Sequence, residues 1–133
     1  MGGDIWLTRC FSQCVVEFKN GAVSEIEIIA RSDDYQITFH AAADTPSHTL
    51  IITFAGLPTE LESDGFETDF CLVHGYDTIF TAQRINTQYQ GLSLEDFEAA
   101  VAPKAAQYKT LVCYGPSLGG YASLYFGGSI NAR

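Results

Sequence analysis

Residues 111–126, which read LVCYGPSLGGYASLYF, decide the fold of this chain because they combine a strand pattern, a tight turn and a helix pattern. An apolar run typical of a buried strand leads into Gly115, Ser117 and Gly119, which form a Gly-x-Ser-x-Gly motif. Small residues on both sides let the backbone turn sharply and leave the serine hydroxyl projecting from the bend. The pattern predicts Ser117 as a nucleophile. A tight turn without a catalytic role is the alternative interpretation.

The composition indicates one ordinary domain, because 47% of the 133 residues are hydrophobic and a substantial core can form. A formal net charge of −9 repels nucleic acid backbones and anionic lipid heads, so neither is an expected partner. The N-terminal residues lack the basic start and apolar run of a secretory signal, and no apolar stretch is long enough to span a bilayer. We therefore expect a cytoplasmic protein that does not associate with membranes.

The four cysteines raise the question of a metal site or a disulfide. Cys10 and Cys14 have a spacing that some metal sites use, but no second close pair of cysteine or histidine completes a tetrahedral site. Cys71 and Cys113 lie in apolar segments, where cysteine behaves as a small hydrophobic residue. We expect reduced, structural cysteines, with no metal and no cofactor.

Residues 1–47 read as an antiparallel β meander. Two alternating segments, 14–18 and 24–29, flank Asn20-Gly21, the pair that best tolerates the positive φ angles of a two-residue hairpin turn. A third segment, 35–39, alternates apolar and polar residues as a half-buried strand does.

Residues 48–133 read as a core of parallel strands connected by helices. Near-continuous apolar runs are typical of strands buried on both faces of a sheet, and they occur at 50–55, 78–82 and 110–114. The helix that follows the serine motif is predicted over 119–126, closed by Gly127 and Gly128.

Two further segments lie between the parallel strands. Residues 67–74 form either a short helix that Gly75 ends or another strand. Ser93 begins a crossover helix with a capping-box pattern, which Pro103 is expected to kink or end.

The segment from Leu50 to Gly128 resembles the central part of the α/β-hydrolase family, on the strength of the Gly-x-Ser-x-Gly motif between strand and helix. The resemblance implies an α/β fold with a partial hydrolase-like sheet, and an activity on the acyl bond of a small ester or thioester. It also implies that Ser117 is the nucleophile. The oxyanion would be stabilised by the amide of Leu118 and by an amide from the Gly56-Leu57 turn.

The acid and histidine that complete such a site follow the serine in this family. The residues after Ser117 contain neither, and His40, His48 and His74 all precede it. Each of these is expected to be structural or exposed rather than a base, with His74 the least unfavourable. We therefore expect residues 1–133 to be a single incomplete hydrolase-like domain, a truncated fragment that is inactive alone.

A non-catalytic interaction module on a hydrolase-like scaffold is the alternative function. An interrupted parallel sheet leaves a strand edge unpaired, and unpaired edges favour self-association. On either interpretation we expect a homo-oligomer formed through the exposed edge of the sheet.

Overall fold

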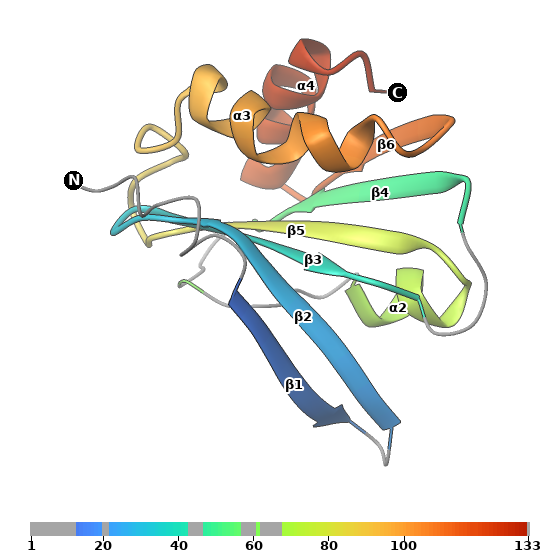
Figure 1. Cartoon of the computed structure of the whole chain (residues 1–133). Helices are drawn as coiled ribbons and strands as arrows, with labels where there is room; N and C mark the ends of the chain where they lie inside the picture. Colours follow the sequence, from blue (N-terminus) through green and yellow to red (C-terminus); the bar gives the residue numbers. More distant parts are fainter. Residues whose placement is uncertain (1–12, 20–21, 43–46, 57–60, 62–67, 133) are drawn as a thin grey trace.

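The computed structural model of the chain describes residues 13–19, 22–42, 47–56, 61 and 68–132. These residues form an α/β fold with one sheet of six strands, which has antiparallel and parallel pairs. The spatial order of the strands is β1-β2-β3-β5-β4-β6 (Figure 1). The strands are β1 (Gln13–Lys19), β2 (Ala22–Arg31), β3 (Tyr35–His40), β4 (Thr49–Phe54), β5 (Asp77–Gln83) and β6 (Thr110–Tyr114). The helices are α2 (Thr68–Val73), α3 (Leu94–Ala105) and α4 (Leu118–Ser129).

The first three strands form the antiparallel meander that the sequence predicts. β1 and β2 pair with Lys19 opposite Ala22, so two residues connect them. Those residues, Asn20 and Gly21, lie outside the described part of the chain, so their turn type stays a prediction. β2 then pairs with β3 after a turn in which the Ser32 hydroxyl accepts a hydrogen bond from the Asp34 amide at 3.0 Å.

The three apolar runs of the second part form the parallel half of the sheet. β4 lies between β5 and β6 and is parallel to both, with Ile52 opposite Ile79 on one side and Cys113 on the other. β3 joins the two halves because it pairs antiparallel with β5. The chain runs from β4 to its neighbour β5 and then crosses to the far side of β4 for β6. Such a reversal opens a crevice beyond the carboxyl ends of the strands.

Helices cover both faces of the sheet, with α3 and α4 on one face and α2 on the other (Figure 1). Phe97 of α3 and Phe126 of α4 are buried against Phe54 of β4. The Phe54 and Phe126 rings stack with centroids 5.9 Å apart. This contact fixes α4, and the turn that precedes it, at the end of β4. None of the described helices is long and apolar enough to cross a membrane.

The crossover helix predicted after Ser93 is present as α3, and the segment that the sequence left open between helix and strand contains a helix, α2. α2 is followed by Gly75, whose φ of 84° is the left-handed conformation that glycine accepts without strain. α3 begins after Ser93, whose hydroxyl accepts a hydrogen bond from the Asp96 amide at 3.0 Å. Pro103 does not stop α3 at once, because the helix continues to Ala105. The missing proline amide therefore affects only the final turn.

The predicted end of the last helix is wrong, since α4 continues through Gly127 and Gly128 to Ser129. A Cβ atom at Gly127 would lie 2.9 Å from the Sγ atom of Cys113 in β6. Glycine at this position therefore permits close packing of α4 on the sheet, and it does not end the helix.

Candidate functional site

Ser117 lies at the bend between β6 and α4, with backbone angles φ 54° and ψ −120°. A residue with a side chain pays about 1–3 kcal/mol for such a conformation, which persists only where the surroundings impose it. Ser117 is exposed, and its hydroxyl makes no capping hydrogen bond to α4. Serine before a helix ordinarily caps it. Here the residue before the helix is exposed and leaves the helix uncapped.

The two glycines of the motif are sterically required. A Cβ atom at Gly115 would lie 2.4 Å from the carbonyl carbon of Gly119. A Cβ atom at Gly119 would lie 2.3 Å from the carbonyl oxygen of Phe54. Both separations are far below van der Waals contact, so a larger residue fits neither position unless the backbone moves. The motif therefore reflects close packing of the first turn of α4 against the ends of both β6 and β4.

Backbone from two strand ends meets beside Ser117. Leu118 is the first residue of α4, and amides in a first helical turn have no acceptor inside the helix. Gly56 lies against the elbow from β4, since a Cβ atom there would be 3.0 Å from the Pro116 carbonyl oxygen. The structure thus places two of the three predicted oxyanion residues at the same turn. The third, Leu57, lies outside the described residues.

The three histidines and Ser117 lie at opposite ends of the strands. β4, β5 and β6 are parallel, and the elbow follows the carboxyl end of β6. His48 precedes β4 and His74 precedes β5, so both lie at the amino ends of these strands. His40 ends β3, which is antiparallel, and it lies opposite Thr78 at the start of β5. A strand of six residues spans roughly 20 Å. None of the three imidazoles can therefore accept the proton of the Ser117 hydroxyl.

The loop from β5 to α3, which the sequence analysis did not single out, holds the turn after β4 in place. Tyr89 is buried, and its hydroxyl donates a hydrogen bond to the carbonyl oxygen of Ala55 at 2.6 Å. Its amide donates to Oε1 of Gln83 at 2.7 Å. Burial raises the pKa of the Tyr89 phenol well above its usual value, which keeps the hydroxyl protonated as a donor. The loop is therefore coupled directly to the predicted oxyanion segment.

Backbone strain in the same loop has little sequence signature. Asn86, Gln88 and Tyr89 all have positive φ, at 67°, 53° and 61°. Asparagine is the only one of the three that favours this conformation. A single asparagine is a weak signal, so pattern analysis gave no reason to select the loop.

Two buried polar atoms at the carboxyl end of β5 have no hydrogen-bond partner within the described ranges, Thr81 Oγ1 and Gln83 Nε2. The amide of Gln83 has a fixed orientation, because its Oε1 must face the Tyr89 amide, which can only donate. An unpaired buried polar group costs about 1–3 kcal/mol. Both atoms lie at the carboxyl end of the parallel strands, as Ser117 does.

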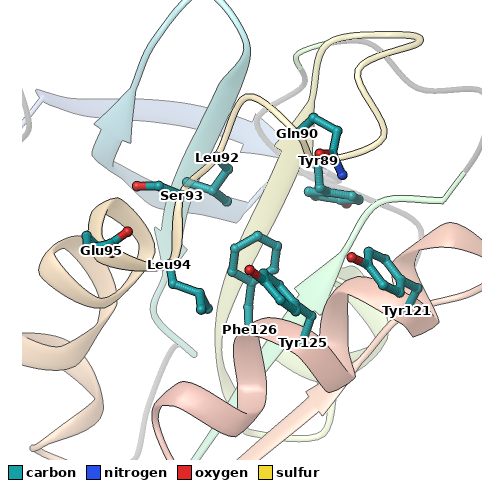
Figure 2. A pocket seen from close by; sticks show the side chains of 9 residues that line it. All are labelled: Tyr89, Gln90, Leu92, Ser93, Leu94, Glu95, Tyr121, Tyr125 and Phe126. Carbon is teal, nitrogen blue, oxygen red and sulfur yellow. The ribbon is translucent and has the colours of Figure 1, made fainter.

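A cavity of about 370 Å³ opens between this loop, the start of α3 and the exposed side of α4 (Figure 2). Its lining includes Tyr121 and Tyr125, which lie on α4 after Ser117. The two rings stack with centroids 6.0 Å apart and planes inclined by 12°. The sequence analysis identified neither tyrosine as a site residue, because aromatic residues at helical spacing usually pack in a core.

The described residues hold no group of three His, Cys, Asp or Glu side chains placed to bind a metal. Cys71 is buried, and burial raises the pKa of the Cys113 thiol to about 12. Cys10 lies outside the described residues.

No known protein family and no curated protein sequence matches the chain.

Proposed function

We propose that this chain carries the nucleophile of a serine hydrolase of the α/β-hydrolase type, which acts on an ester, thioester or similar acyl bond. The observation that carries the proposal is the positive φ of Ser117 between two glycines that leave no room for side chains. A turn that served only to connect β6 to α4 would be less strained with glycine at this position. The serine is favoured there only if its hydroxyl has a role.

The geometry supports nucleophilic acyl transfer. Oγ of Ser117 would attack the carbonyl carbon of the substrate while a base takes its proton. The oxygen that becomes negative would accept hydrogen bonds from the Leu118 amide and from an amide of the Gly56-Leu57 turn. One such donor contributes about 3 kcal/mol to the transition state. Departure of the alcohol or thiol leaves the acyl group on Ser117, and water then releases it.

The arrangement of the sheet also supports this proposal. An antiparallel meander leads into parallel strands, and the predicted oxyanion turn and the elbow follow two neighbouring parallel strands, β4 and β6. Ligands of open α/β sheets bind at this kind of position, beyond the carboxyl ends of the strands where the chain order reverses. The resemblance to α/β-hydrolases implies the same placement.

The general base is the missing part of the site. Since all three histidines lie at the other end of the strands, none of them can serve as the base, and the proposal requires another group in that role. We therefore expect the chain alone to acylate slowly and to turn over poorly. Added imidazole, a small diffusible base, should accelerate the acylation.

An activated acetate ester tests the proposal directly. The chain is incubated with p-nitrophenyl acetate, with and without imidazole, and the modified peptides are identified by mass spectrometry. We expect acetyl groups on Ser117, formed faster with imidazole and absent from Ser117→Ala. Ser93 is the internal control, because it is also exposed but caps α3. Equal acetylation of Ser93 and Ser117 would contradict the proposal.

A non-catalytic interaction module is the second candidate, and the position of β6 favours it. β6 is the last strand of the sheet that the described residues form, and its residues are only partly buried. Tyr114 at its end is 50% exposed, and Leu124 of α4 is 82% exposed. We propose that a second copy of the chain pairs with this edge. Such pairing supplies the hydrogen bonds that the outer side of β6 lacks within the sheet.

A further inference from the structure

The cavity beside α4 has the dimensions and the lining of a small-molecule site. Its volume of about 370 Å³ is within the range of ligand pockets. Figure 2 shows the Tyr121 and Tyr125 side chains pointing from α4 toward the loop, with Ser93 and Glu95 across from them. Phe126 closes the back of the cavity, where it packs edge-on against Tyr125 with ring centroids 5.0 Å apart.

The charges around the cavity select against anions. Glu95 is the charged residue of the lining, and no lysine or arginine is among the residues that line it. Burial raises the pKa of the Tyr35 phenol, and the charge of Asp96, the residue after Glu95, raises it further. Arg84, at the end of β5, is held in an ion pair with Asp34 at 3.0 Å. The lining of the cavity therefore carries one carboxylate and no basic side chain, on a chain with a net charge of −9.

The aromatic groups have the matching property. Tyr121 and Tyr125 are 51% and 49% exposed, so their rings are accessible to a ligand. The faces of aromatic rings carry partial negative charge and attract cations, above all organic ammonium groups. Stacking of the two rings on one helix fixes their orientation before a ligand binds. Aromatic faces beside a carboxylate are the chemistry that recognises an organic cation.

We propose that this cavity binds an organic ammonium group. The site also fits the proposed function, on which this second step rests. Tyr121 follows Ser117 by one helical turn and Tyr125 by two, a rise of about 6 Å and 12 Å along α4. An ester whose carbonyl carbon lies at Ser117 would place an ammonium group in the cavity if a short chain of a few atoms joins the two. The inferred substrate class is therefore a cationic ester.

Binding of choline tests the inference without any need for catalysis. Choline is compared with its uncharged isostere, in which carbon replaces the nitrogen, by NMR titration of the Ser117→Ala chain. We expect choline to shift the amide signals of the loop and of α4, and to bind at least about fivefold more tightly than the isostere. Equal affinity for the two compounds, or shifts elsewhere on the chain, would overturn the inference.

Matched variants identify the groups that bind the cation. Glu95→Gln and Tyr121→Leu should each weaken choline binding about fivefold. Glu98→Gln, also exposed on α3, and Tyr114→Leu, with an exposure of 50% against 51% for Tyr121, should leave it unchanged. Loss of binding in the control variants as well would overturn the assignment.

The two proposals fail separately. Choline binding without acylation of Ser117 would refute the hydrolase and leave the ammonium site standing. Acylation of Ser117 without any preference for choline would refute the ammonium site alone.

Discussion

Replacement of Gly119 by alanine tests whether the elbow is held by close backbone contact. A Cβ atom at this position would lie 2.3 Å from the Phe54 carbonyl oxygen and 3.1 Å from that of Ala55. Ordinary contact begins at 3.4 Å, so the first separation is short by 3.4 − 2.3 = 1.1 Å. The obstacle is backbone at the end of β4, which cannot rotate away as a side chain can.

The magnitude follows from two opposing effects. Alanine is favoured over glycine in a helix by about 1 kcal/mol. Overpacking a tight contact costs about 1–3 kcal/mol, and a backbone obstacle places Gly119→Ala at the upper end. The net expectation is a loss of about 2 kcal/mol, or a fall in melting temperature of about 8 °C for a domain of this size.

Gly128→Ala is the matched control on the same helix. A Cβ atom at Gly128 meets nothing within 4 Å, so only the helix preference remains, and the variant should gain up to about 1 kcal/mol. Urea unfolding followed by circular dichroism measures both variants. If Gly119→Ala were as stable as Gly128→Ala, the steric explanation of the motif would be refuted.

Three further predictions concern the loop between β5 and α3, the Cys113 thiol and the edge strand β6. Tyr89→Phe removes the hydrogen bond to the turn after β4 and should cost about 1–2 kcal/mol in urea unfolding, whereas Tyr114→Phe should cost nothing, and equal stabilities would refute the role of the loop. Burial raises the pKa of the Cys113 thiol from 9.0 to about 12, so the folded chain retains a proton that the unfolded chain loses. The contribution of the protonated thiol to the free energy of unfolding is therefore complete below pH 9 and should fall by about 1.4 kcal/mol per pH unit above it. The free energy of unfolding should fall more steeply with pH than in Cys113→Ala, and matching pH profiles for the two chains would contradict this. Val112→Lys puts a charge on the edge strand and should shift a dimer toward monomer in sedimentation, whereas Ala102→Lys on α3 should not, and a wild-type chain that stays monomeric at high concentration would exclude the edge pairing.

Local patterns predicted the elements well because each one rests on neighbouring residues. The hairpin around Asn20-Gly21, the cap at Ser93 and the elbow at Ser117 all depend on short-range geometry. The order of the strands does not, because β3 pairs with β5 across a long stretch of intervening chain. The sequence therefore indicated an α/β sheet with the elbow after its last strand, and left the sheet order undetermined.

The parts of the candidate site that the sequence did not reveal depend on tertiary contacts. Tyr89 adopts a positive φ and reaches the turn after β4, but neither glycine nor proline occurs at positions 86–90, and the glycine of the loop, Gly91, follows the strained residues. Gly127 looked like a helix terminator because the sequence could not show that β6 packs against it. Tyr121 and Tyr125 looked like core residues, and only the fold places them at the opening of a cavity.

Selective phosphonylation of Ser117 tests the central claim most directly. A fluorophosphonate probe is applied to the folded chain and to the chain unfolded in urea, and mass spectrometry measures the modification of Ser117 relative to Ser93. The strained turn and the exposed Ser117 hydroxyl predict that Ser117 reacts faster than Ser93 only when the chain is folded. Equal rates at the two serines in the folded chain would show that the elbow confers no reactivity, and would contradict the account.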